Sequence, residues 1–181
     1  RIEPEEGRFN ESELAHYEEV IKALKKRGLE PFITLWHFTL PIWFAEKGGW
    51  QNRDSVKYFE RYVNKVAETY KRLGVKFWIT INEPEIYTLN SYVRGTWPPG
   101  KRKFINYFTV SNNLICAHKA AYYAIKKAIP YSEIGIAKNN SYFENYGFNP
   151  WNKFLKNLGE KLWNHYFLTR IQEQQDFIGL N

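Results

Sequence analysis

Apolar side chains recur along this chain with two periods, one typical of amphipathic helices and one of buried strands. Between residues 11 and 27 they return every three or four positions, at Leu14, Tyr17, Ile21 and Leu24. Asn10 and Glu13 form the sequence pattern of a helix start, and Gly28 is a typical stop. The spacing therefore predicts a helix over residues 11–27 with one buried face.

Four short apolar runs and three more helical segments follow. The runs, at residues 31–36, 75–81, 134–137 and 177–180, are nearly continuous in apolar side chains, as in strands that are buried on both faces. Helical spacing separates them, over residues 54–73, 106–129 and 154–171. Regular alternation of helix and strand predicts an α/β fold: one domain over residues 1–181, with a parallel sheet covered by helices.

The longest loops follow the strands and not the helices. In a β/α barrel such loops build the active-site face, so residues at strand ends are the ones to examine. A complete barrel takes about 250 residues. The chain has 181 residues and four predicted strands, so we expect part of a (β/α)8 TIM barrel.

Polar side chains follow each of the four predicted strands. Asn82 and Glu83 come after the second strand, and the following Pro84 predicts that Glu83 stays extended. The other three are His37, Asn139 and Asn181. Amides and an imidazole around one carboxylate suit a ring that bears many hydroxyl groups. A turn that only ends a strand, with a structural histidine nearby, is the alternative reading.

Composition and charge narrow the classes of function. Aromatic residues make up 18% of the chain, a share suited to stacking against ringed ligands as well as to a core. The net charge is +7, but basic residues interleave with Glu on helical faces, which indicates solvated surface and no nucleic-acid site. The single cysteine, Cys116, excludes an internal disulfide.

Other sequence signals are absent. No signal peptide, bilayer-spanning run or lipidation motif is evident, so we expect a cytoplasmic protein without a membrane partner. The chain shows no His/Cys spacing for zinc, no glycine-rich phosphate loop and no Gly-x-Ser-x-Gly elbow. We therefore expect neither a metal nor a cofactor.

Five motifs in a fixed order resemble those of glycoside hydrolase family 1, the β-glucosidase and β-galactosidase family. They are RIEPEEGRFN, TLWHFTLPIWF, ITINEP, SYVRGTWPPG and DFIGLN, and together they span almost the whole chain. The resemblance implies an eight-stranded barrel of which this chain covers about half, strands three to six. It also implies cleavage of β-glycosides or oligosaccharides with retention of configuration, by two glutamates and without a cofactor.

The resemblance also implies roles for single residues. Glu83 matches the general acid/base, and Asn82 matches the residue that binds the 2-hydroxyl of the sugar. His37 matches a histidine that binds the glycone. Arg1 matches an arginine that contacts the nucleophile, and Asn181 opens a further motif of the family.

The chain departs from the family in two ways. Phe38, also expected at the sugar, stands where many relatives carry Trp, and the Thr-Glu-Asn-Gly motif of the nucleophile is absent. Glu85 and Glu3 are the two other carboxylates considered as substitutes. One hypothesis is a retaining β-glycosidase whose remaining strands belong to a longer protein or are supplied by another chain, which includes a second copy of this one. The other is an inactive half-barrel that keeps part of the sugar-binding face.

Overall fold

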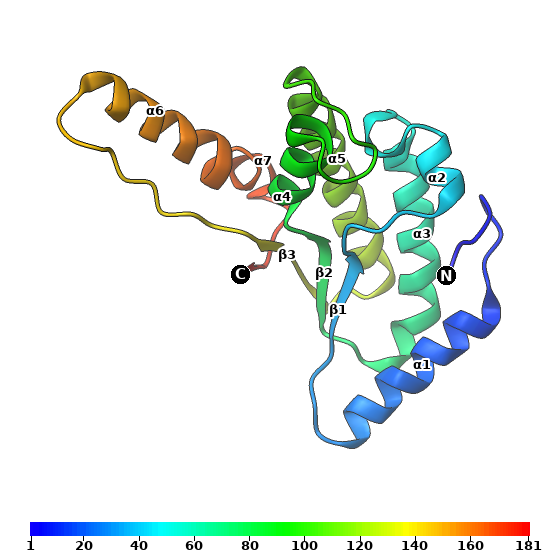
Figure 1. Cartoon of the computed structure of the whole chain (residues 1–181). Coiled ribbons are helices and arrows are strands. Elements are labelled where there is room, and N and C mark those ends of the chain that lie inside the picture. The colour runs from blue at the N-terminus through cyan, green and yellow to red at the C-terminus, as the bar shows by residue number, and fades with distance from the viewer.

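The computed structural model describes residues 1–181 and contains one sheet of four parallel strands in the order β1-β2-β3-β4. The strands are β1 (Phe32–Trp36), β2 (Phe77–Asn82), β3 (Glu133–Lys138) and β4 (Phe177–Leu180). Helical segments connect each strand to the next (Figure 1). A doubly wound sheet reverses its strand order at a switch point, whereas a barrel keeps strands in sequence order. The order therefore agrees with the predicted barrel segment.

Three long helices were predicted to within three residues at each end. They are α1 (Glu11–Lys26), α3 (Ser55–Tyr70) and α5 (Ile105–Ala128). The Asn10 side chain caps α1 by accepting hydrogen bonds from the backbone N–H groups of Ser12 and Glu13. Asp54 lies at the N-cap of α3, but its carboxylate pairs with Lys57 at 3.1 Å and does not cap the backbone.

The remaining helical segments differ from the prediction. The expected helix over residues 154–171 is instead α6 (Pro150–Glu160), a π-helical turn (Lys161–His165) and α7 (Leu168–Ile171). The loops after β1 and β2 contain the short helices α2 (Ile42–Glu46) and α4 (Pro84–Thr88). Of all these helices, none combines the length and apolar content needed to cross a membrane.

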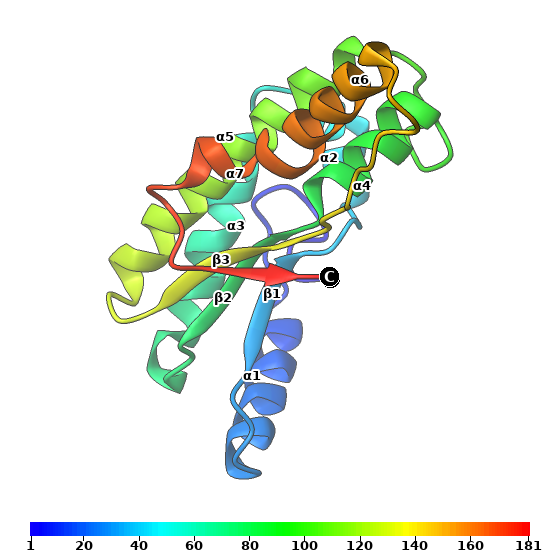
Figure 2. The ribbon, with the colours of Figure 1, turned by 90° about the vertical axis from the view of Figure 1, so that its left-hand side faces the viewer.

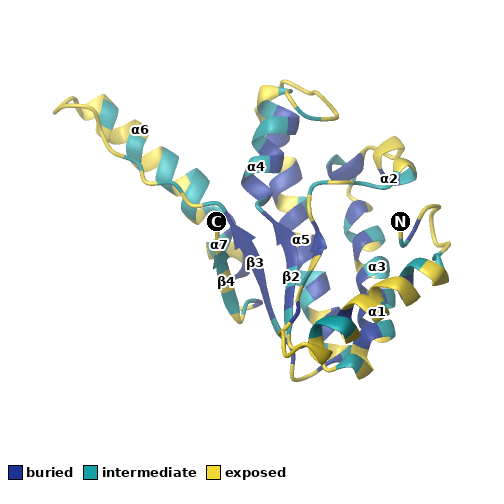
Figure 3. Ribbon diagram, turned by 60° about the horizontal axis from the view of Figure 1, so that its bottom comes forward, coloured by how far each residue is buried: buried dark blue, intermediate teal, exposed yellow.

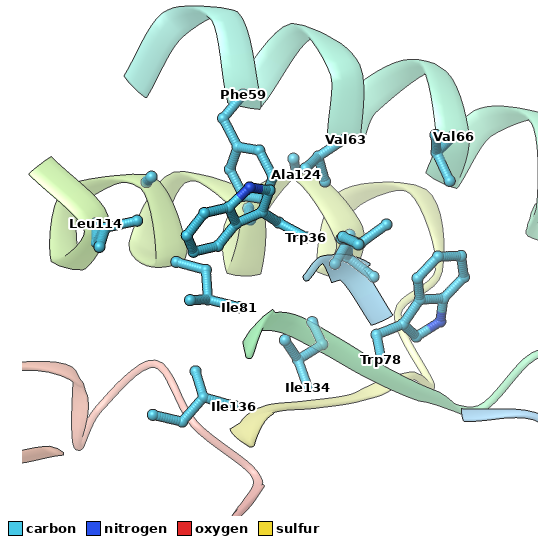
Figure 4. Packing of buried hydrophobic residues seen from close by; sticks show 14 of the residues in the cluster. Trp36, Phe59, Val63, Val66, Trp78, Ile81, Leu114, Ala124, Ile134 and Ile136 are labelled. Atoms are coloured by element: carbon cyan, nitrogen blue, oxygen red, sulfur yellow. The ribbon is translucent and has the colours of Figure 1, made fainter. Parts of the chain in front are cut away.

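One face of the sheet carries the core. Side chains of Trp78, Ile134 and Ile136 pack beneath α3 and α5, with Phe59 and Leu114 above them (Figure 4). Figure 2 shows these helices gathered on one side of the strands. The buried residues follow the sheet and α5, whereas α6 extends outward and buries no residue (Figure 3).

The opposite face of the sheet is only partly covered, which corrects the prediction of strands buried on both faces. The rings of Phe32, Phe77 and Phe177 pack on this face, with Phe32 and Phe77 stacked at 4.4 Å, yet Phe32 is 54% exposed. In a closed barrel this face is the interior, filled by side chains from all eight strands. Four strands cannot fill it.

A buried histidine connects the sheet to its helical cover. His118 on α5 lies 2.6 Å from Thr80 Oγ1 on β2 and 2.7 Å from the carbonyl oxygen of Gln174. Burial lowers the pKa of His118 to about 4, so this imidazole is neutral near pH 7. Its polar atoms are satisfied within the fold, which identifies a structural histidine.

Gly135 allows β3 and β4 to approach closely. A Cβ atom at this position would lie 2.2 Å from the carbonyl oxygen of Phe177, far inside van der Waals contact. At Gly179 on β4, the nearest atom to such a Cβ would be 3.5 Å away, an ordinary contact. Comparing substitutions at the two glycines therefore distinguishes a steric clash from the change in backbone entropy that any glycine-to-alanine substitution brings.

We expect Gly135→Ala to lower the free energy of unfolding by about 1–3 kcal/mol, because backbone must move to admit the methyl group. Gly179→Ala is the matched control and should change it by less than about 1 kcal/mol. Urea unfolding followed by tryptophan fluorescence measures both. Equal effects of the two substitutions would contradict the close-approach explanation.

Candidate active site

The carboxyl ends of the four strands bring the predicted polar residues together. Asn82 Nδ2 lies 3.4 Å from His37 Nε2, which joins the end of β2 to the end of β1. Asn181 Nδ2 lies 3.5 Å from Asn82 Oδ1 and donates a 2.8 Å hydrogen bond to Glu83 Oε1. Asn139 Nδ2 lies 3.5 Å from the same Glu83 oxygen. Five of the seven predicted residues thus form one contact network.

The Glu83 carboxylate is half-buried and surrounded by amides. Its backbone N–H donates a 2.7 Å hydrogen bond to the carbonyl oxygen of Ala137 on β3. Its side chain is therefore held at the end of β2 while Asn139 and Asn181 approach from the two following strands. None of the ion pairs of the chain includes this carboxylate.

The backbone at Glu83 is left-handed, with φ 41° and ψ 62°, and the prediction that Pro84 keeps it extended is wrong. Pro84 occupies the first turn of α4, a position that its fixed φ favours. The chain therefore turns at Glu83, directly from strand into helix. Phe38, with φ 71°, is the other non-glycine residue with positive φ. Such strained residues cluster at functional sites.

Aromatic rings form a wall beside these polar groups. The Phe38 ring lies 4.9 Å from the imidazole of His37 and 5.0 Å from the indole of Trp97. It also stacks against Tyr87 on α4 at 6.5 Å. Phe38 thus lies beside the hydrogen-bonding network and offers a flat apolar surface next to it.

Arg1 is not brought to the network. Its guanidinium is exposed and lies 4.0 Å from the Glu13 carboxylate. Arg1 and His37 both border a groove of about 680 Å³, which runs between α1, β1 and α3 and is lined mainly by apolar core residues. The other polar strand-end residues do not line that groove, so His37 is the one residue that it shares with the network around Glu83.

The two substitute carboxylates are occupied elsewhere. Glu3 is buried, where its Oε1 accepts hydrogen bonds from the Arg61 guanidinium and the Gly7 backbone N–H. Glu85 is also buried and pairs with Lys138 at 2.9 Å. Neither can act as a second carboxylate at the site.

The Lys138–Glu85 pair was missed by sequence reasoning. Burial raises the pKa of Glu85 to about 7, partly offset by the nearby Lys138 ammonium, and burial lowers the pKa of Lys138. A signal was present: Ile134 and Ile136 are buried core residues, and the two-residue period of a strand puts Lys138 on the same face. A lysine in that row needs a buried partner.

Comparisons with known proteins identify the family. The family model described as Glycosyl hydrolase family 1 matches residues 1–175. Beta-glucosidase A of Thermotoga maritima is 32% identical over 211 aligned residues, which cover 100% of this chain and 47% of the relative. Beta-glucosidase A of Acetivibrio thermocellus is 37% identical over 145 residues, which cover 78% of this chain and 32% of the relative. The chain thus spans about half or less of the length of the curated relatives it matches.

Solved structures of family 1 enzymes superpose closely on this chain. A beta-glycosidase from Pyrococcus horikoshii superposes with a TM-score of 0.93 at 34% identity, covering 100% of this chain and 45% of that one. A family 1 b-glucosidase from Thermotoga maritima in complex with isofagomine lactam gives 0.90 at 29% identity, covering 100% and 48%. These neighbours are (β/α)8 barrels, so the prediction of about half a barrel is confirmed.

We expect Lys138→Met to lower the free energy of unfolding by about 3–5 kcal/mol, because it leaves the Glu85 carboxyl buried without its partner. The loss should grow as the pH rises from about 6 through the folded-state pKa of Glu85, which is about 7 in the wild type. Unfolded Glu85 ionises well below this range in both proteins, and the folded variant holds the proton to higher pH than the folded wild type. Urea unfolding across this range measures the difference.

The paired substitution Lys138→Met/Glu85→Leu is the control for that measurement. It removes both charges, so it should recover most of the lost stability and the added pH dependence. A single substitution no more destabilising than the pair would contradict the buried ion pair.

Proposed function

The chain belongs to glycosyl hydrolase family 1, and on that premise we propose that it forms the acid/base half of a retaining β-glycosidase. The enzyme would hydrolyse terminal β-linked sugars from glycosides or oligosaccharides. The observation that carries the proposal is the half-buried Glu83 carboxyl at the mouth of the sheet, which two strand-end amides contact beside a group of aromatic rings.

Glu83 is the proposed general acid and base. In the first step its carboxyl group gives a proton to the glycosidic oxygen as the bond from that oxygen to the anomeric carbon breaks. A second carboxylate forms a new bond to the anomeric carbon at the same time. In the second step the Glu83 carboxylate takes a proton from water, and the resulting hydroxide displaces the second carboxylate. The Asn181 hydrogen bond at 2.8 Å supports this role, because it orients the Glu83 carboxylate.

The other strand-end residues are the proposed sugar contacts. Asn82 and His37, 3.4 Å apart, present hydrogen-bonding atoms to the hydroxyl groups of the glycone. Asn139 and Asn181 extend the polar rim, and the Phe38 ring covers an apolar face of the sugar. Solved relatives in complex with deoxynojirimycin and with glucoimidazole support a sugar-shaped ligand for this site.

The nucleophile lies outside this chain in our proposal. Retaining cleavage needs two carboxyl groups about 5–5.5 Å apart. The two alternative carboxylates, Glu3 and Glu85, are buried in ion pairs. Arg1, which is exposed, is proposed to contact the nucleophile once the remaining strands of the barrel are in place.

Glu83→Gln in the complete enzyme should reduce kcat/KM on an aryl β-glycoside with a poor leaving group by about 10²–10⁴-fold, because the proton donor is lost. Glu144→Gln, the same change at an exposed position in the loop after β3, is the control and should leave activity unchanged. Normal turnover by Glu83→Gln would overturn the assignment.

The purified 181-residue chain alone should hydrolyse nothing above background, because it supplies one catalytic carboxyl group where two are needed. The same chain with Glu83→Gln sets the background and reveals any contaminating hydrolase. Turnover by the isolated chain that disappears with Glu83→Gln would show that the site is complete without further strands.

A further inference from the structure

One ion pair in the chain is buried at both ends, and it lies directly behind the candidate acid/base. The Lys138 and Glu85 side chains are 0% and 2% exposed, whereas every other ion pair has at least one partner that is 25% exposed or more. Glu85 follows Glu83 by two residues, and Lys138 precedes Asn139. The pair therefore joins the two segments that meet at the Glu83 carboxyl.

We propose that Lys138 and Glu85 are positioning residues, whose buried ion pair fixes the turn that aims the Glu83 carboxyl group into the site. This inference rests on the proposed function and names two residues that act through Glu83, without contact to the sugar.

The Lys138 ammonium group connects three segments. It lies 2.9 Å from Glu85 Oε1, and it donates hydrogen bonds to the carbonyl oxygens of Asn139 at 2.9 Å and Trp163 at 2.7 Å. These atoms belong to the first turn of α4, the end of β3 and the π-helical turn Lys161–His165. Two hydrogen bonds and one ion-pair contact therefore surround this ammonium group.

The turn at Glu83 requires such a restraint. A left-handed backbone at a residue other than glycine persists only where the surroundings hold it. The bond from Glu83 N–H to Ala137 holds the start of the turn, and the Thr88 hydroxyl bonds to Pro84 within α4. Beyond the Asn139–Glu83 contact at the N-cap, the Lys138–Glu85 pair is the side-chain connection between the first turn of α4 and the end of β3.

Stability alone gives no reason for charges at these positions. Buried ion pairs are often no more stabilising than apolar residues of similar volume. Neither oxygen of the Glu85 carboxylate accepts a hydrogen bond, and the Lys138 ammonium group at 2.9 Å is its ion-pair partner. The pair has a geometric effect instead. Lys138 binds both Glu85 on α4 and the Asn139 carbonyl oxygen, and the Asn139 side chain contacts the Glu83 carboxylate.

The test compares two substrates in the complete enzyme carrying Lys138→Met/Glu85→Leu. An alkyl β-glycoside needs protonation of its leaving group, whereas a 2,4-dinitrophenyl β-glycoside does not. We expect kcat/KM on the alkyl glycoside to fall about 10–100-fold, because a misplaced acid transfers its proton poorly. The value for the dinitrophenyl glycoside should change by about twofold or less.

Two controls separate positioning from general damage. Lys76→Met/Glu133→Leu removes a partly exposed pair, with a 2.8 Å contact, at the amino ends of β2 and β3, and should leave the ratio of the two substrates unchanged. In a Glu83→Gln background, the Lys138→Met/Glu85→Leu pair should add no further loss on the alkyl glycoside, because its effect passes through Glu83.

Three results would overturn the inference: an equal loss on both substrates, no loss on either, or a selective loss that persists without the Glu83 carboxyl. A wild-type enzyme whose activity does not depend on Glu83 would instead overturn the proposed function, and the inference with it. The first measurement, wild type against Glu83→Gln, tells these two failures apart.

Discussion

The arrangement at the mouth of the sheet depends on one backbone hydrogen bond, from the Glu83 N–H to the Ala137 carbonyl at 2.7 Å. This bond extends the pairing of β2 and β3 by one residue past the strand, at the point where the chain turns left-handed into α4. It thereby places the Glu83 side chain next to the residues that follow Ala137. The contacts from Asn139 and Asn181, and the ion pair behind them, all follow from this placement.

Part of this structure could be read from the sequence because it follows from local rules. Apolar runs located all four strands, and parallel strands carry their following residues to one edge, so His37, Asn82 and Glu83 were expected together. The turn at Glu83 could not be read in this way. The preference of the residue before proline for extended backbone is a local tendency, and here α4 and its contacts outweigh it.

The other features that the sequence did not predict depend on contacts between residues far apart in the chain. Lys138 and Glu85 lie more than fifty residues apart, and neither residue alone indicates its partner. Strands rich in apolar residues predicted a sheet covered on both faces, but the second face of this sheet faces the barrel interior, for which four strands supply only part of the filling. His118 is a polar residue with a structural position: it is buried and hydrogen-bonded to Thr80 and Gln174, away from the strand-end network.

The shortest side-chain contact of Glu83 is its 2.8 Å hydrogen bond from Asn181, which lies 98 positions later in the sequence, directly after β4. Loop closure over such a separation is slow compared with local folding. During synthesis on the ribosome, β2 and its glutamate emerge before β4, so the Glu83 carboxylate lacks its Asn181 hydrogen bond until β4 pairs with β3. Completion of this polar cluster therefore requires that all four strands of this chain have paired.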